Sequence, residues 1–250
     1  MFETAEEKGL STGLVATCAI THATPASFVA HQPDRNMYEE IAADFLNTDI
    51  DLFIGGGRDH FNKRKDGRDL LAELKKKGYD TVSAIDSLRF AKGEKVAALL
   101  AEEHLPPMEM GRGDMLKSST VFALDKLKKN KNGFFLVVEG SQIDWGGHDN
   151  NVPYIVSEML DFDQTVGEVL KFAAADGETL VVITADHETG GMAVSGGDLE
   201  QGVVSGKFTT ENHTAVMVPV FAYGPQAELF GGIMENTDFY FKFKQVLGLP

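Results

Sequence analysis

The sequence has almost no cysteine and no long apolar run, and each shortage excludes a class of protein. Among 250 residues there is one cysteine, Cys18, so neither an internal disulfide nor a cysteine-based zinc site can form. No stretch approaches the roughly 18 apolar residues that a membrane-spanning helix requires. The residues after Met1 are acidic and lack the basic start and apolar run of a secretory signal. Either the protein is cytoplasmic or its natural beginning precedes Met1.

Basic residues are also scarce. The chain carries 23 Lys and Arg against 38 Asp and Glu, a formal net charge of −15, which argues against nucleic-acid binding. The same charge disfavours anionic substrates unless metal ions invert the local field. The apolar and charged fractions, 43% and 24%, are ordinary for a globular protein. This length can bury a large core as one α/β domain or as two small domains.

Short apolar runs alternate with helical patterns, which predicts an α/β fold with a mostly parallel sheet. Strands are expected at residues 14–20, 50–54, 80–84, 134–138, 179–184 and 218–222. Helices are expected at residues 25–34, 36–45, 70–77, 114–131, 152–175 and 237–246. Residues 195–211 indicate a polar loop or hairpin. Residues 85–114, with Pro106-Pro107 and several glycines, indicate an irregular or excursion segment. With no repeat or clear linker, we expect one domain over residues 1–250.

Polar side chains follow the expected strands, where ligands bind in open α/β sheets. Glu139, Asp144 and His148 come directly after the strand at 134–138. If a helix begins near Asp144, the Asp144 and His148 side chains lie one turn apart on one face and can chelate a divalent metal. The alternative is a salt-bridged helix start with a capping aspartate.

Two further junctions add ligands of the same kind. Asp186 and His187 follow the strand at 179–184, and His213 precedes the strand at 218–222. Alone, the first pair also fits a helix cap with a surface histidine, and a lone histidine is more often structural. Together with Asp144 and His148, His213 completes a three-ligand site with an open position, as catalytic zinc uses. Asp186 and His187 begin a second site, and paired metals suit phosphoryl transfer.

One arginine fits anion chemistry. Arg35 ends the helix expected from Pro25, and a guanidinium fork matches two phosphate oxygens. A solvated surface arginine is the alternative, and without the metal ligands it would be preferred.

With these residues assembled, the chain resembles the alkaline phosphatase family from about Phe2 to Pro250, most loosely over residues 60–114. The motifs that carry the resemblance are residues 20–27, 138–144 with His148, 184–187, 212–214 and 222–225. The resemblance implies a three-layer α/β/α fold and hydrolysis of phosphate monoesters through a phosphoserine intermediate. It also implies two Zn²⁺ ions and one Mg²⁺ ion, with a phosphate monoester or inorganic phosphate as the bound ligand.

The resemblance implies a role for each matching residue. The first zinc would be bound by Asp144, His148 and His213, and the second by Asp186 and His187. Glu139 and Thr24 would serve the magnesium site, and Arg35 would hold the phosphate. His22 and Trp145 occupy positions that vary in the family, where they would tune the magnesium and the phosphate.

The nucleophile of the family is absent from these residues. The family carries its serine in an Asp-Ser-Ala type motif upstream of the segments found here. The nearest surrogate, Asp86-Ser87-Leu88, matches no nucleophile motif and fits a turn or helix cap better. Ser141 and Ser195 lack the Gly-x-Ser-x-Gly elbow. We therefore expect an N-terminally truncated, inactive member whose first zinc site persists while the others are weak or empty. The lost strands would leave an apolar sheet edge that favours self-association.

The sequence is also compatible with other functions. The chain alone could be a catalytically dead metal-binding domain or interaction protein. Related metalloenzymes cleave phosphodiesters or sulfate esters or move phosphate between positions, although the Arg35 segment and Asn212-His213-Thr214 fit the monoesterase better by resemblance. The family is largely periplasmic or secreted, so an absent N-terminus would have carried any signal. Homodimers are common in the family, yet one sequence fixes neither the oligomeric state nor the physiological ester.

Overall fold

The computed structural model describes residues 1–249, which divide into two compact units. The first unit contains Met1–Pro106 and Arg112–Gly140, and the second contains Pro107–Gly111 and the chain from Ser141 onward. A single domain over residues 1–250 would require these two units to pack against each other, and it stays a prediction. Within residues 1–249, none of the helices combines the length and apolar character needed to cross a bilayer.

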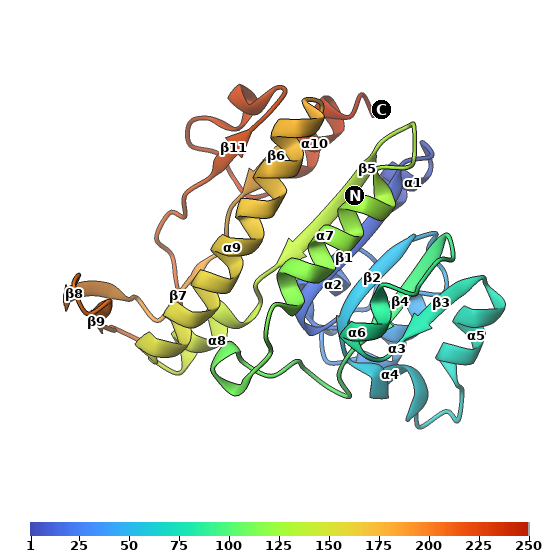
Figure 1. Ribbon diagram of the computed structural model, residues 1–250, viewed down its shortest axis with the longest axis horizontal. Coiled ribbons are helices and arrows are strands. Elements are labelled where there is room, and N and C mark those ends of the chain that lie inside the picture. Colours follow the sequence, from blue (N-terminus) through green and yellow to red (C-terminus); the bar gives the residue numbers. More distant parts are fainter. Residues whose placement is uncertain (250) are drawn as a thin grey trace. The chain divides into compact units, whose positions relative to one another are not determined.

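The first unit is built on a five-stranded sheet whose strands all pair in parallel (Figure 1). The strands are β1 (Ser11–Ala19), β2 (Leu52–Gly56), β3 (Tyr79–Val82), β4 (Lys95–Leu99) and β5 (Phe134–Glu139), in the order β3-β4-β2-β1-β5. β1 and β2 are almost wholly buried, as expected for parallel strands that are covered on both faces. The predicted α/β class with a parallel sheet is confirmed.

Helices cover both faces of this sheet. They are α1 (Phe2–Glu6), α2 (Ala23–Ser27), α3 (Tyr38–Asp44), α4 (Arg58–Asn62), α5 (Leu70–Lys76), α6 (Ile85–Leu88) and α7 (Met115–Leu127). On one face, the Phe135 ring of β5 lies 5.8 Å from Phe2 of α1, and the Phe53 ring of β2 lies 6.0 Å from Phe61 of α4. On the other face, a Cβ added to Gly13 of β1 would lie 2.7 Å from a methyl carbon of α7. Because adjacent strand residues point to opposite faces, the layers are α/β/α, as expected.

Two sequence-based expectations are wrong in this unit. Residues 85–114 are not irregular throughout, because Lys95–Leu99 forms the buried strand β4 between β3 and β2. Its run of Val, Ala, Ala and Leu has weak intrinsic β propensity, so burial between two neighbours decides its conformation. The helix expected from Pro25 towards Asp34 ends at Ser27. Pro33 disfavours helical backbone at the residue before it, which limits any continuation. The other expected elements of the unit agree within a few residues.

The second unit contains one long helix and three short antiparallel strand pairs. Its helices are η1 (Met108–Met110), α8 (Gln142–His148), α9 (Val152–Asp176), η2 (Ala227–Phe230) and α10 (Asp238–Val246). Its strands pair as β6 (Val181–Ile183) with β11 (Phe221–Tyr223), β7 (Glu188–Thr189) with β10 (His213–Thr214), and β8 (Ala193–Asp198) with β9 (Val203–Lys207). The Asn151 side chain caps α9, which ends at Gly177 in the left-handed conformation. Of the polar loop or hairpin expected at residues 195–211, the structure shows a hairpin, formed by β8 and β9.

Candidate metal centre

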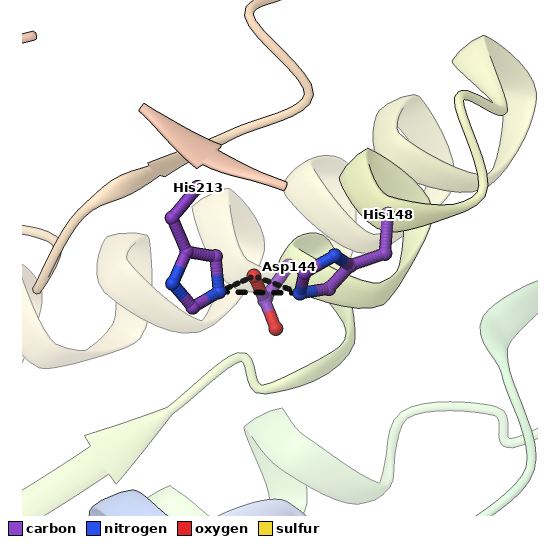
Figure 2. Close-up of side chains that lie close together, drawn as sticks. All are labelled: Asp144, His148 and His213. Carbon is purple, nitrogen blue, oxygen red and sulfur yellow. Dashed lines mark hydrogen bonds and ion pairs between the residues drawn. The ribbon is translucent and has the colours of Figure 1, made fainter. Parts of the chain in front are cut away.

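Three of the predicted ligands converge in the second unit. Figure 2 shows the side chains of Asp144, His148 and His213 pointing toward one another. The two histidine Nε2 atoms lie 3.2 Å apart. The Asp144 Oδ1 atom lies 3.4 Å from Nε2 of His148 and 3.5 Å from Nε2 of His213. The structure therefore presents two nitrogens and one oxygen to a common point.

Local structure explains how the ligands meet. Asp144 and His148 are four residues apart on α8, which places both on one face of the helix. His213 comes from β10, which pairs with β7 so that His213 lies opposite Thr189. A Cβ added to Gly147 of α8 would lie only 2.8 Å from the Thr189 carbonyl oxygen. Glycine at this position therefore allows β7, and with it β10, to approach the helix that carries the other two ligands.

Neighbouring groups orient the ligands. The His148 Nδ1 atom lies 2.6 Å from the backbone carbonyl oxygen of Glu211. A carbonyl oxygen can only accept, so Nδ1 carries the proton and, in the neutral ring, Nε2 presents a lone pair to the cluster. The Thr189 hydroxyl donates to Oδ1 of Asp144. Partners of this kind fix the tautomer and direction of metal ligands.

The spacing of the three ligand atoms fits a zinc ion. In a tetrahedral site with bonds of 2.0–2.1 Å, neighbouring ligand atoms lie about 3.3–3.4 Å apart. The observed separations of 3.2, 3.4 and 3.5 Å bracket that value. Without a cation, two hydrogen-bond acceptors, Nε2 of His148 and the Asp144 carboxylate, would face each other. Two imidazoles and one carboxylate, with a fourth position left open, form the type of ligand set that catalytic zinc uses.

The second predicted pair lies beside this cluster. Asp186 and His187 follow β6, and Oδ2 of Asp186 lies 3.1 Å from Nε2 of His187. The His187 ring stacks on the His213 ring with a centroid separation of 3.5 Å and an interplanar angle of 20°. The two side chains offer two ligand atoms and do not belong to the three-residue group. Their assignment to a second zinc stays a prediction.

The residues predicted to bind magnesium and phosphate lie in the first unit. Glu139 ends β5, and its Oε2 atom lies 3.5 Å from Sγ of Cys18, whose thiol also lies 3.2 Å from the Ala19 carbonyl oxygen. Thr24 is the second residue of α2. The exposed Arg35 places Nη2 3.5 Å from Nε2 of His22, the residue that precedes α2.

Trp145, by contrast, lies on α8 in the second unit, directly after Asp144. The roles of Trp145 and of these first-unit residues stay predictions.

The serines considered as substitutes for the nucleophile have structural positions. Ser87 lies inside the short helix α6, and the buried Ser141 precedes α8. The Ser195 hydroxyl donates to the Ser205 carbonyl oxygen at 3.3 Å, within the β8–β9 hairpin. This geometry gives none of them a place in the three-residue cluster.

Sequence reasoning missed two histidines of the first unit. His104 follows β4, and its Nδ1 atom accepts a hydrogen bond of 3.0 Å from the Ala19 backbone N–H at the end of β1. Burial lowers the pKa of His104, which suits this acceptor role. The His104 ring also meets His22 edge-on at 5.4 Å. His60 of α4 lies 2.7 Å from the Thr21 hydroxyl. Both histidines stand outside any sequence motif, so only the folded chain shows that they hold the segment carrying His22.

Comparisons with known proteins agree with this architecture. Residues 1–204 match the alkaline phosphatase family. Alkaline phosphatase 3 of Bacillus subtilis is 36% identical over an alignment 316 positions long, which covers 95% of this chain and 68% of that protein. The alkaline phosphatase of the Antarctic bacterium TAB5 has a solved structure that matches with a TM-score of 0.93 at 44% identity, covering 99% of this chain and 75% of that one. A mutant of the TAB5 enzyme with Mg bound in its M3 site matches with a TM-score of 0.93 at 42% identity, covering 100% and 75%. This chain therefore belongs to the alkaline phosphatase family.

Proposed function

We propose that the cluster of Asp144, His148 and His213 binds zinc, and that in a family member with its nucleophile this zinc site serves the hydrolysis of phosphate monoesters. The observation that carries this proposal is the tetrahedral spacing of the three ligand atoms, 3.2–3.5 Å, in a member of the alkaline phosphatase family. A bound zinc ion would polarise a phosphoryl oxygen and stabilise the charge of an attacking or leaving oxygen. Asp144, His148 and His213 would hold that ion and leave a position free for a substrate oxygen.

The second zinc is proposed to bind Asp186 and His187. Their side chains lie 3.1 Å apart, and the His187 ring packs on the His213 ring. Two protein ligands hold zinc less firmly than three, because each ligand adds to the binding free energy. We therefore expect this site to fill only at higher zinc concentrations than the first.

In the first unit, Glu139 and Thr24 are proposed as magnesium ligands. Carboxylate and hydroxyl oxygens are the hard ligands that Mg²⁺ prefers. Arg35 is proposed to bind phosphate, since its guanidinium fork is exposed. His22, with Nε2 3.5 Å from that fork, would tune phosphate affinity, and Trp145 would do the same beside Asp144.

The 250 residues alone are proposed to bind zinc without turning over a phosphate ester. They contain no Asp-Ser-Ala segment, and Ser87, Ser141 and Ser195 occupy structural positions. For this polypeptide, the same observation favours a second function: a metal-binding domain without catalysis. Phosphate monoesters and inorganic phosphate are the ligands proposed for the family's reaction.

Metal analysis combined with an activity assay tests these proposals. The purified chain is stripped with a chelator, reloaded with zinc and magnesium, dialysed, and analysed for bound metal. We expect close to one zinc per chain, little magnesium, and no hydrolysis of a chromogenic aryl phosphate. Two firmly bound zinc ions with magnesium would contradict the weak second and third sites. Turnover that scales with zinc content would contradict the proposed lack of catalysis.

Two parts of the proposal are supported by the family alone. The enzyme is proposed to act in the periplasm or outside the cell, and to form a homodimer. Fractionation of the source cells tests the first, and light scattering of the zinc-loaded chain tests the second.

A further inference from the structure

The first unit contains a cavity, widely open to solvent, that involves none of the residues proposed to bind metal or phosphate. Its volume is about 340 Å³. It lies at the carboxyl ends of β3 and β4, where Val82 and Leu99 end their strands, and beside α5. In open α/β sheets, ligands bind outside the carboxyl ends of the strands. The volume is at the lower end of the range for small-molecule sites.

Two basic side chains line this cavity in a protein of strongly acidic composition. Arg58 comes from the first residue of α4, and Lys75 comes from α5. The chain as a whole has 23 basic residues against 38 acidic ones. Two basic side chains at one cavity therefore differ from the acidic charge balance of the whole chain. Cations that line one cavity attract anionic ligands.

Both cations keep hydrogen-bonding capacity for a ligand. The Arg58 Nη2 atom lies 3.6 Å from Oε1 of Glu102, which is beyond hydrogen-bonding distance. That same Glu102 oxygen lies 3.5 Å from the Lys63 ammonium, so its charge is shared. Within residues 1–249, the exposed Lys75 ammonium has no ion-pair or hydrogen-bond partner. The two lining cations, Arg58 and Lys75, therefore outnumber this one neighbouring carboxylate.

The remaining walls fit a small organic body. Leu71, Val82 and Leu99 provide apolar surface, and Thr81 and Ser83 provide hydroxyl groups. Small-molecule sites characteristically combine apolar walls with a few polar groups that fix orientation. An inorganic anion would leave the apolar walls unused, and a neutral apolar compound would leave the two cations unused.

We propose that this cavity binds a small organic anion. Arg58 and Lys75 hold a phosphate or carboxylate group, and Leu71 and Val82 contact its apolar portion. The guanidinium of Arg58 can donate two parallel hydrogen bonds to two anion oxygens, while Lys75 contributes a point charge. The site shares no residue with the zinc cluster and does not depend on the function proposed for it.

Isothermal titration of the metal-stripped full chain tests the proposal. The probes are phenylphosphonate, which cannot be hydrolysed as an ester, benzoate, inorganic phosphate and the neutral benzyl alcohol. We expect saturable binding of at least one of the two aromatic anions, tighter than that of inorganic phosphate, and none of benzyl alcohol. Whichever aromatic anion binds more tightly identifies the anionic group.

Matched substitutions locate the binding. Arg58→Gln and Lys75→Gln should each weaken the aromatic anion about tenfold, the effect of losing one charge-assisted contact. Lys76→Gln, on the same helix but outside the cavity, should leave affinity within about twofold, because it changes net charge equally. Lys75 is exposed, so its variant is expected to fold, and circular dichroism confirms that for each protein.

Three results would overturn the proposal. The first is no saturable binding of either aromatic anion. The second is equal weakening by Lys75→Gln and Lys76→Gln. The third is loss of anion binding in Arg35→Gln together with full binding in Arg58→Gln and Lys75→Gln. That result would assign the anion to Arg35, the residue proposed to bind phosphate.

Discussion

Replacing His213 by alanine removes one of the three side chains that converge in the second unit, and it should weaken zinc binding by about 10²–10³-fold. The residue offers Nε2 at 3.2 Å from Nε2 of His148 and 3.5 Å from Oδ1 of Asp144. The other two ligands come from one helix, α8, and remain in place without it. The variant therefore converts a three-ligand site into a two-ligand site with little other change.

The magnitude follows from the number of ligands. Structural zinc sites with four protein ligands bind with about 10–16 kcal/mol, or roughly 2.5–4 kcal/mol for each ligand. Since 1.4 kcal/mol corresponds to a factor of ten, one ligand accounts for about 10²–10³ in affinity. His213 is exposed, so water replaces the lost nitrogen, which places the expected value towards the lower end of that range.

Competition with a chromophoric zinc chelator measures the affinity of the stripped chain. His31→Ala is the matched control, because His31 also pairs with a carboxylate, Glu3, at 2.8 Å but lies outside the cluster. Thr189→Val removes the hydroxyl that donates to Asp144 and should weaken zinc binding about tenfold, the usual effect of losing an orienting partner. The reasoning fails if His213→Ala stays within about threefold of the unmodified chain, or if His31→Ala weakens zinc as much.

Three further predictions concern stability. Burial lowers the pKa of His104 from its ordinary 6.5, so the unfolded chain binds the proton more readily than the folded chain. The free energy of unfolding should therefore fall as pH drops below about 6.5. The His104→Asn variant keeps an acceptor for the Ala19 N–H and should lose less unfolding free energy between pH 7 and pH 5, as measured by urea titration. Gly147→Ala should destabilise the protein by about 1–3 kcal/mol despite alanine's better helix propensity, because its Cβ would lie 2.8 Å from the Thr189 carbonyl oxygen. A raised Tm would contradict the close packing of α8 against β7. Leu74→Ala in the core should cost about 2–5 kcal/mol by denaturant unfolding, and a cost below about 1 kcal/mol would show that α5 is loosely packed.

The sequence predicted most elements because their patterns are local. The apolar run of β5 and the capped, periodic segment of α9 carry their own signals, and their observed bounds agree with the prediction within a residue. β4 gave no such signal, since Val96 and its two alanine neighbours fit several conformations. Pairing with β2 and β3 stabilises it as a strand, and that pairing depends on chain segments far away in sequence.

The candidate site divides in the same way. Asp144 and His148 could be placed together from sequence alone, because four residues make one helical turn. Their meeting with His213 required the pairing of β7 with β10 and the close approach that Gly147 allows. The family motifs suggested this meeting by resemblance, whereas the tetrahedral spacing of the ligand atoms became visible only in three dimensions.

By itself, the sequence determined the chemical types at the centre: two imidazoles, one carboxylate and no thiolate, in a chain with a single cysteine. The tertiary structure decided which nitrogen of His148 faces the cluster, because the Glu211 carbonyl holds the other one. It also placed His104 against the end of β1 and gathered Arg58 with Lys75 at one cavity. Backbone carbonyls and N–H groups are the same at every residue, and cavities form between distant segments. Neither leaves a pattern along the chain, so only the folded structure shows them.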